Sequence, residues 1–466
     1  MATAHRKSNS LDRIKINGVW LSKEQEVREG VANAFQQLLS ENSEWKADIG
    51  RLQLKQISQQ EAKCLELPFS EVEVHSALMD MNGDKAPGPD GFTVAFWQSC
   101  WEFVKEEILE MFKEFHEQNS FLKSLNKRFL TQKGVRKVVS SYQNAFVMGR
   151  QILDGSLIAN EALQKMGFGS KWLGWMWSCI SIARFSILMN GVQAGFFPSS
   201  KGLRQGDPLS PYLFVMGMEV LSVLIRKVVE GGYLSGCSIR GGRRPAFNIL
   251  HLLFADDTVV FCEAKKEHLM HLSWILFWFE AASGLRINLA KSEIIPVGGV
   301  EKVDEMAVEL GCKVGLLPSV YLGLPLGAPN KAASVWDGVE ERVRRRLALW
   351  KQQYNSKGGR ITLIKSTMAN MPLYQMSLFR MPKTVARRLE KLQKDFLWEG
   401  GNLERKVNLV NWEVICVDKE KGRLSLRKLT LLNKVLLGKW IWRFACVKDD
   451  LWKQVLVAKY GQEDFG

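Results

Sequence analysis

Two adjacent aspartates between two short β-prone runs constrain the fold of this chain more than any other feature. Residues 249–254 and 258–261 are mostly apolar or β-branched, and they flank Ala255-Asp256-Asp257. This pattern predicts a β-hairpin with the two aspartates at its tip. Adjacent carboxylates repel each other unless a cation neutralises them, and hard oxygen ligands favour magnesium or manganese. The alternative is an ordinary turn, because aspartate is common in turns.

A second motif, Gly202-Leu-Arg-Gln-Gly-Asp-Pro-Leu-Ser-Pro211, predicts the start of a helix. Gly206 permits an unusual turn, and Asp207 before Pro208 suits an N-cap followed by proline at the first helical position. Apolar residues over 212–222 continue that helix. A helix N-terminus beside a glycine turn favours a phosphate or a base edge. The alternative is a plain transition from loop to helix.

The charge of the chain indicates a polyanionic partner. Its 466 residues carry a net charge of +15. Residues 341–400 hold 14 Lys+Arg and 4 Asp+Glu, a net of +10, whereas residues 61–120 hold 4 and 13, a net of −9. A basic region of this size favours nucleic acid first and an anionic membrane second. The alternative is a pair of solvated helices of opposite sign.

No targeting or membrane segment is expected. The first residues lack the apolar core of a signal peptide, and Arg184 and Glu219 interrupt the longest apolar stretches. Eight cysteines without a Cys-x-x-Cys pair argue against a disulfide framework and a zinc knuckle. Cys262, His268 and His271 are better explained as helix-face residues than as metal ligands. We therefore expect an intracellular protein of the nucleus or cytoplasm.

Apolar periodicity predicts a chain that is largely helical at both ends. Ser70 followed by Glu73 has the spacing of a capping box. Residues 82–91 hold three glycines and two prolines and are expected to be irregular, and residues 166–300 are expected to mix helix and sheet. The predicted helical regions are 20–60, 67–81, 92–115, 331–400 and 433–444.

Together the two motifs resemble the reverse transcriptase of LINE-type (non-LTR) retrotransposons, in which a Gly-Leu-Arg-Gln-Gly-Asp-Pro-Leu-Ser-Pro block precedes a Phe-Ala-Asp-Asp hairpin. The resemblance covers nearly the whole chain. Further blocks match in the same order: Lys85-Ala-Pro-Gly-Pro-Asp-Gly91, Gln143-Asn-Ala-Phe-Val-Met-Gly-Arg-Gln-Ile-Leu-Asp154, Ser283-Gly-Leu-Arg-Ile-Asn-Leu-Ala-Lys-Ser292, Tyr321-Leu-Gly-Leu-Pro-Leu-Gly327, Ser356-Lys-Gly-Gly-Arg-Ile-Thr-Leu-Ile-Lys365 and Lys439-Trp-Ile-Trp-Arg-Phe444.

The resemblance implies an α+β right-hand polymerase with fingers, palm and thumb. Its antiparallel palm sheet is incomplete in this chain, and the thumb and C-terminal region are helical. The implied segments are 1–65 (a helical linker after the family's endonuclease, which is absent), 66–165 (truncated fingers), 166–300 (partial palm with the catalytic hairpin), 301–400 (primer grip and basic helical thumb) and 401–466 (a truncated helical C-terminal region).

The resemblance also implies residue roles. The catalytic Mg²⁺ or Mn²⁺ would be held by Asp256 and Asp257, and Lys291 would lie near the leaving pyrophosphate. The nucleotide and template pocket would be lined by Arg204, Gln205 and Gly206. The primer grip would be formed by Gly323, Leu324 and Pro325. The nucleic-acid backbone would be contacted by Arg344, Arg345, Lys357, Arg360 and Lys365. The implied partners are an RNA template, an RNA/DNA hybrid and deoxynucleoside triphosphates, with no membrane.

Two expected blocks are missing between matching flanks. The family's first metal-binding aspartate belongs between residues 161 and 166, yet no aspartate occurs between Asp154 and Asp207. The basic fingers block belongs between residues 121 and 140, where Lys133 and Arg136 sit in no matching motif. The pattern indicates an internal deletion, either in the gene or in its predicted transcript.

We therefore expect a reverse transcriptase-like protein whose catalysis is impaired by loss of one metal-binding carboxylate. The lost block also includes a central palm strand, so its neighbours lose their backbone partners and the palm is expected to be distorted. Two alternatives stay open, namely a nucleic-acid-binding remnant without catalysis and a pseudogene product without function.

Overall fold

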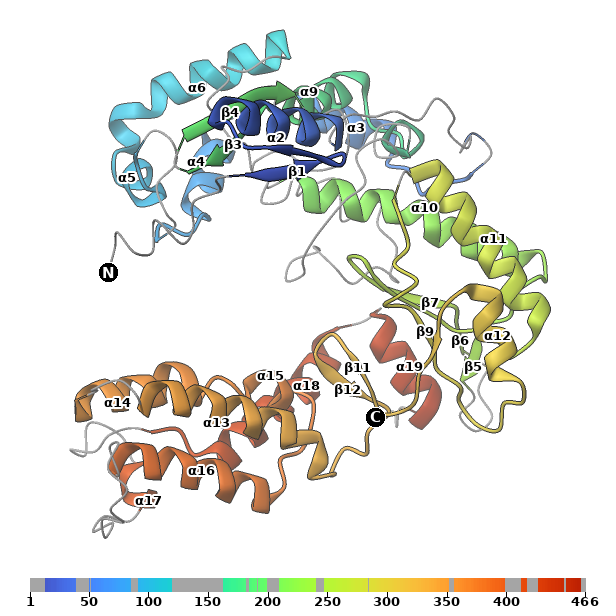
Figure 1. The fold of residues 1–466 in the computed structure, drawn as a ribbon, viewed down its shortest axis with the longest axis vertical. Helices are drawn as coiled ribbons and strands as arrows, with labels where there is room; N and C mark the ends of the chain where they lie inside the picture. The colour runs from blue at the N-terminus through green and yellow to red at the C-terminus, as the bar shows by residue number, and fades with distance from the viewer. Residues whose placement is uncertain are drawn as a thin grey trace. The chain divides into compact units, whose positions relative to one another are not determined.

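The computed structural model describes most of the chain as two compact units, each of which is treated by itself below (Figure 1). Unit 1 comprises residues up to 240, then 246–292 and 304–312; unit 2 comprises 241–245, 293–303 and 313–466. The described residues are 13–38, 50, 52–84, 91–119, 162–181, 184–190, 192–198, 209–239, 247–283, 285–351, 356–398, 412–416, 426–447 and 450–461.

Unit 1 begins with a small hairpin and a helix. Strands β1 (Ile14–Ile16) and β2 (Val19–Leu21) pair antiparallel, and α2 (Glu24–Leu38) packs against them and against the later β4. Val27 and Val31 of α2 are buried with Met189 in a small apolar cluster. This helix lies within the region 20–60 that periodicity predicted to be helical.

Four helices then form the acidic part of unit 1. They are α3 (Gln59–Leu65), α4 (Glu71–Met79), α5 (Val94–Ser99) and α6 (Trp101–Gln118). The predicted capping box is confirmed, since Ser70 accepts a hydrogen bond from the backbone N–H of Glu73 and the Glu73 carboxylate accepts one from that of Ser70. The helix expected over 92–115 is divided at Cys100, which ends α5 and caps α6.

The larger core of unit 1 forms around α10 (Ser210–Glu230). This helix is buried along most of its length and lies beside α11 (Lys266–Ser283), with α9 (Ser170–Ser181) packed into the same core. Paired strands accompany these helices: β3 (Arg184–Met189) with β4 (Val192–Pro198), β5 (Cys237–Ile239) with β6 (Phe247–Ile249), and β7 (His251–Phe254) with β8 (Asp257–Val260). Helix α12 (Val303–Leu310) belongs to unit 1 from residue 304 onward.

The predicted start of the long helix was wrong by two residues. We expected Asp207 at the N-cap and Pro208 at the first helical position, but α10 starts at Ser210, its N-cap is Leu209, and its proline is Pro211. Pro211 still lies in the first turn of α10, as the prediction required of a proline. Proline is favoured there because the backbone N–H that it lacks would have no hydrogen-bond partner within the helix. Residues 207 and 208 themselves lie outside the described residues.

Unit 2 is mainly helical, as periodicity predicted for residues 331–400. Its two short sheets pair β9 (Glu293–Ile294) with β10 (Lys313–Val314) and β11 (Ser319–Tyr321) with β12 (Leu324–Leu326). One apolar core joins residues from Val335 to Leu429 around the buried Trp336. The helices are η1 (Ser334–Trp336), α13 (Asp337–Lys351), α14 (Lys357–Leu363), η2 (Ile364–Met368), α15 (Leu373–Met376), α16 (Lys383–Trp398), α17 (Trp412–Ile415), α18 (Leu429–Cys446) and α19 (Leu451–Tyr460).

The chain is therefore a mixture of helices and small sheets. Within the described residues every sheet has two strands, and each pair is antiparallel except β9 with β10. The helix predicted over 433–444 is confirmed inside α18. None of the described helices has the length and hydropathy of a membrane span. The five segments implied by the family resemblance stay predictions, because the two units do not delimit them.

Candidate active site

The predicted aspartate hairpin is confirmed as β7–β8. Phe254 pairs with Asp257, and Ala255 and Asp256 form the two-residue turn, with Ala255 at φ 53°. Ala255 is fully buried in the unit 1 core, whereas Asp256 and Asp257 are exposed. The inner face of the hairpin is thus packed into the unit 1 core, and both carboxylates are exposed to solvent.

The electrostatics of the tip show carboxylates that repel each other. Partial burial raises the pKa of the Asp257 carboxyl, the charge of Asp256 raises it further, and the charge of Lys291 lowers it. Lys291 follows the helix α11 in a turn where its backbone N–H donates to the carbonyl oxygen of Asn288 at 3.0 Å. The structure therefore brings three predicted catalytic residues, Asp256, Asp257 and Lys291, into one electrostatic neighbourhood.

Asp256 and Asp257 supply part of the ligands that one hard divalent cation needs. Two carboxylates supply the oxygen ligands that magnesium prefers, and in nucleotide sites such an ion usually takes one or two carboxylates with the rest from phosphates and water. Over the described part of the chain, no group of three or more His, Cys, Asp and Glu side chains could hold a metal. Asp154 and Asp207, the aspartates on either side of the stretch without aspartate, and Glu161 lie outside that part.

A buried polar contact lies behind the hairpin. The Nε2 atom of His251, on β7, is 2.8 Å from the Oγ atom of Ser222, on α10, and both side chains are completely buried. His251 pairs with Val260, so it sits at the far end of the β7–β8 ladder from Asp257. The contact fixes the base of the hairpin to α10, which is buried along most of its length.

The predicted nucleotide pocket cannot be placed. Arg204, Gln205 and Gly206 fall in residues 199–208, outside the described residues. The structure begins again at Leu209, at the N-cap of α10.

The predicted primer-grip residues form a second tight hairpin, β11–β12, in unit 2. Tyr321 pairs with Leu324, and the turn between them has Leu322 at φ 52° and Gly323 at φ 75°. Positive φ at both central residues is the geometry that suits the twist of a two-residue hairpin, and it explains a glycine at the second position. Pro325 pairs with Val320 on a strand whose only partner among described residues is β11.

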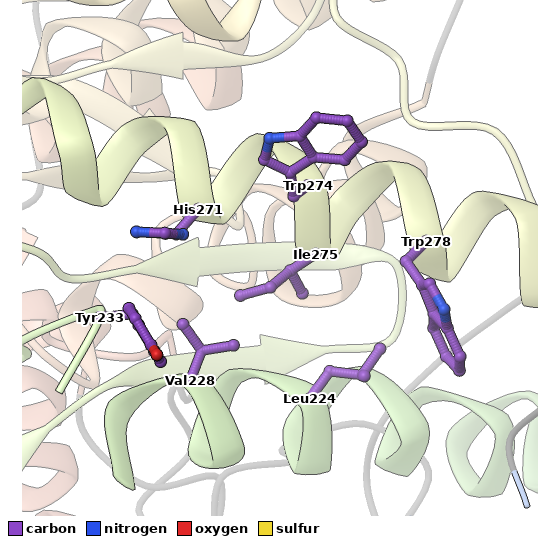
Figure 2. Close-up of a pocket in the computed structure, with 7 residues that line it drawn as sticks. All are labelled: Leu224, Val228, Tyr233, His271, Trp274, Ile275 and Trp278. Carbon is purple, nitrogen blue, oxygen red and sulfur yellow. The ribbon is translucent and has the colours of Figure 1, made fainter. Parts of the chain in front are cut away.

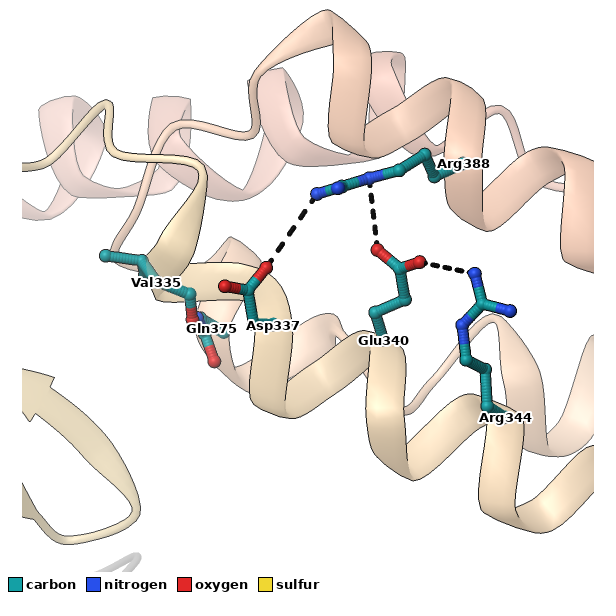
Figure 3. A network of polar contacts seen from close by, with 6 residues as sticks. All are labelled: Val335, Asp337, Glu340, Arg344, Gln375 and Arg388. Carbon is teal, nitrogen blue, oxygen red and sulfur yellow. Dashed lines mark hydrogen bonds and ion pairs between the residues drawn. The ribbon is translucent and has the colours of Figure 1, made fainter.

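The basic residues of α13 differ in how far their charge is compensated. Figure 3 shows Glu340 between two arginines, with Arg344 at 2.7 Å and the Nε atom of Arg388 at 3.1 Å. Arg345 pairs with Glu341 at 2.7 Å on the exposed surface. The positive charge that Arg344 and Arg345 offer to a phosphate backbone is therefore partly compensated within the helix.

The other predicted backbone contacts lie on or beside α14. Ser356 caps this helix by accepting a hydrogen bond from the N–H of Gly359 at 3.1 Å. Lys357 is exposed, with its ammonium 5.8 Å from the centre of the Trp398 ring, and Arg360 and Lys365 are half-buried.

Four further basic residues of α13 and α16 are exposed, and none of them makes an ion pair in the described structure. Their signal in the sequence is the i, i+4 spacing along a helix, which places each pair on one face. They are Arg342 and Arg346 of α13 and Arg387 and Lys391 of α16.

A separate apolar groove in unit 1 contains none of the predicted site residues. It lies between α10 and α11 and has a volume of about 290 Å³ (Figure 2). Its lining is aromatic and aliphatic, apart from the Tyr233 hydroxyl, the His271 ring and the indole nitrogens. The lining residues are Leu224, Val228, Tyr233, His271, Trp274, Ile275 and Trp278.

Comparison with known proteins agrees with the hairpin geometry. Residues 158–325 match the protein family described as reverse transcriptase (RNA-dependent DNA polymerase). This range contains the β7–β8 hairpin, Lys291 and the turn of β11–β12. The segment is therefore reverse transcriptase-like.

Three relatives extend the match. A Xenopus laevis protein named as the transposon TX1 uncharacterized 149 kDa protein is 21% identical over 420 residues, 74% of this chain and 31% of its own length. An Arabidopsis thaliana protein named for ribonuclease H is 36% identical over 122 residues, 26% of this chain and 20% of its own. An uncharacterized mitochondrial protein of Arabidopsis thaliana is 52% identical over 71 residues, 15% of this chain and 56% of its own.

These matches support a reverse transcriptase-like retrotransposon protein. The chain spans less than two thirds of the length of each of these relatives.

Proposed function

We propose that this chain is an internally deleted reverse transcriptase of a LINE-type (non-LTR) retrotransposon, with impaired catalysis. Its ancestral reaction would be RNA-templated DNA synthesis with Mg²⁺ or Mn²⁺. The observation that carries the proposal is the β7–β8 hairpin, which presents Asp256 and Asp257 within the segment that matches the reverse transcriptase family. The proposal assigns the right-hand layout to the chain, with fingers over 66–165, palm over 166–300 and thumb over 301–400.

The residues of the hairpin suit one half of a nucleotidyl-transfer site. In this reaction the primer 3′-hydroxyl attacks the α-phosphorus of the nucleotide, and paired divalent ions stabilise the attacking and leaving oxygens. Asp256 and Asp257 would hold the ion shared with the triphosphate. Lys291, whose charge already acts on Asp257, would neutralise the leaving pyrophosphate.

The impairment follows from how many protein carboxylates are available. Two ions side by side need ligands from two separate strands, and this chain has lost the block that supplies the second. Asp207 would be held in a turn next to the start of α10, and Asp154 would need a rearranged backbone to reach the site. Neither replaces the missing carboxylate in our proposal.

The remaining residues would bind substrates without taking part in the chemistry. Arg204, Gln205 and Gly206 would contact template and nucleotide, and the turn of β11–β12 would support the primer strand. The basic surface of α13, α14 and α16 would follow the backbone of an RNA/DNA hybrid through contacts that do not read sequence. By family resemblance, the protein would act in the nucleus or cytoplasm.

Primer extension tests the proposed impairment. Purified protein, a poly-rA template with an oligo-dT primer, dTTP and magnesium should give little or no extension. Asp256→Ala is the diagnostic variant, and Asp304→Ala, an exposed aspartate in the first turn of α12, is the matched control. Magnesium-dependent product that is lost in Asp256→Ala and kept in Asp304→Ala would contradict the proposal.

A nucleic-acid-binding remnant without catalysis is the second candidate, and the exposed arginines and lysines of unit 2 favour it. Binding of an RNA/DNA hybrid in a gel-shift assay should weaken steeply as salt rises, because each phosphate contact releases counterions. Arg387→Gln with Lys391→Gln should reduce the salt slope by about one to two units. Arg345→Gln, which removes a residue already paired with Glu341, should change the slope less. Tight binding that does not respond to salt would contradict this candidate.

A further inference from the structure

The outer face of α18 carries an apolar stripe. Leu431, Val435 and Trp442 are 60%, 62% and 74% exposed, and the small residues Gly438 and Ala445 continue the stripe on the exposed surface. The five positions are separated by four, three, four and three residues, which is the heptad spacing of a helix that packs against another helix.

The opposite face of α18 is fixed within unit 2. Asn433 is buried, donates hydrogen bonds to the carbonyl oxygens of Met376 at 2.7 Å and Phe379 at 2.9 Å, and accepts one from the N–H of Met381 at 2.9 Å. The indole N–H of Trp440 donates to the carbonyl of Ser377 at 2.6 Å. At 100° per residue, Asn433 and Trp440 lie on the side of the helix away from Val435 and Trp442. The orientation of the exposed stripe is therefore set by specific contacts.

Charge selects the kind of partner that would cover this stripe. The helix Leu429–Cys446 contains Lys434, Lys439 and Arg443 and no acidic residue. Lys434 and Lys439 lie on opposite borders of the stripe, where flanking side chains of a paired helix meet. A second copy of α18 would place lysines against lysines, so a two-fold pairing of the stripe is disfavoured. Acidic side chains at the flanking positions of the partner would instead be attracted.

The shape of the stripe fits a protein helix better than a nucleic acid. Apart from its two chain neighbours and the backbone of α18 itself, no atom lies within 4 Å of the position that a Cβ would occupy on Gly438, so the surface is open between Val435 and Trp442. An apolar side chain of a partner helix can enter this space. Trp442 offers one planar face, but Leu431 and Val435 offer none, whereas nucleic-acid platforms rely on several aromatic faces for successive bases.

We propose that α18 is a docking surface for an acidic amphipathic helix of another protein. The contact would use Leu431, Val435 and Trp442 as apolar anchors and Lys434 and Lys439 as flanking charges. This inference is independent of the polymerase chemistry, because it involves none of the residues assigned to the active site or to backbone binding.

A labelled peptide of about three heptads, with leucine at the two core positions and glutamate at the flanking positions, is the probe. Fluorescence anisotropy with the full chain should show saturable binding. Trp442→Ala should weaken it about tenfold or more, as expected for a central aromatic anchor. Trp20→Ala, which removes an exposed tryptophan of β2, is the matched control and should leave the affinity unchanged.

A charge exchange makes the test specific. Lys434→Glu with Lys439→Glu should weaken the glutamate peptide about tenfold and strengthen a peptide with lysine at the flanking positions. Circular dichroism should show that each variant is folded as the parent is. The proposal is overturned if a peptide of the same composition in scrambled order binds equally well, or if single-stranded RNA displaces the peptide. It is equally overturned if sedimentation shows a dimer of the chain that Trp442→Ala dissociates.

Discussion

The Oγ atom of Ser222 lies 2.8 Å from the Nε2 atom of His251, and this contact joins the buried helix α10 to the strand that leads to Asp256. Burial lowers the pKa of the His251 imidazole to about 4, and the positive charge of Arg226 acts in the same direction. The ring is therefore neutral at physiological pH. We expect the contact at the base of the hairpin to require this neutral form.

The pKa of His251 predicts an acid-sensitive unit 1. The unfolded chain has the higher pKa, near 6.5, so it binds more protons than the folded chain between about pH 6.5 and pH 4. The contribution that neutral His251 makes to the free energy of unfolding should be fully present above about pH 6.5. It should fall by about 3 kcal/mol as the pH decreases to about 4. Chemical denaturation at several pH values measures the effect. His251→Gln cannot become charged, so its stability should fall less over the same window; equal slopes for both proteins would contradict the assignment.

Glu340 should matter more to unit 2 than its neighbour Glu341. Glu340 is nearly buried and contacts two arginines, whereas Glu341 makes one exposed pair (Figure 3). Replacing Glu340 by Gln removes the anion of Arg344 and leaves Arg388 only its longer contact with Asp337 at 3.9 Å, so it should cost about 1–2 kcal/mol. Glu341→Gln should cost no more than about 0.5 kcal/mol. Urea denaturation compares the two variants, and equal losses would show that Glu340 has no bridging role.

Asn433 should be the most sensitive polar position of α18. Its amide satisfies two backbone carbonyls and one backbone N–H in a buried place. Asn433→Ala leaves these groups without their partner and should destabilise unit 2 by about 3 kcal/mol. Asn370→Ala is the exposed control, because water can replace the hydrogen bonds that Asn370 makes with Ser366 and Arg427. A loss below that of the control would contradict the prediction.

Two glycines of unit 2 should respond to alanine in opposite directions. Gly323 has φ 75° in the turn of β11–β12, and Gly323→Ala should cost about 1 kcal/mol, since an L-residue is strained there.

Gly338 lies in the first turn of α13, and outside its own helix nothing lies within 4 Å of an added Cβ. Gly338→Ala should stabilise by up to about 1 kcal/mol. Thermal unfolding measures both, and a stabilising Gly323→Ala would exclude the left-handed turn.

The sequence was most informative where a local pattern decides the structure. The alternation around Asp256 predicted the β7–β8 hairpin, and the Ser70–Glu73 spacing predicted a helix start. Both depend on interactions over a few residues, so they can be read from neighbours in the chain.

Other features depend on partners that are distant in the chain. The hydrogen bond between Ser222 and His251 joins positions 29 residues apart, and nothing local indicates it. The division at Cys100 and the pairing of Arg388 with Glu340 depend on packing within each unit in the same way. Sequence reading placed Arg344 and Arg345 on a basic surface but could not show that Glu340 and Glu341 partly compensate them.

The central claim is that only the hairpin supplies protein carboxylates to the catalytic ion. An experimental structure of the chain with Mn²⁺, a template–primer and an incoming nucleotide tests it directly, because the anomalous signal of manganese locates the ion. We predict that Asp256 and Asp257 are the only carboxylates bound to it. A third carboxylate on the ion, from Asp154, Asp207 or any other residue, would contradict the claim and would indicate an active polymerase.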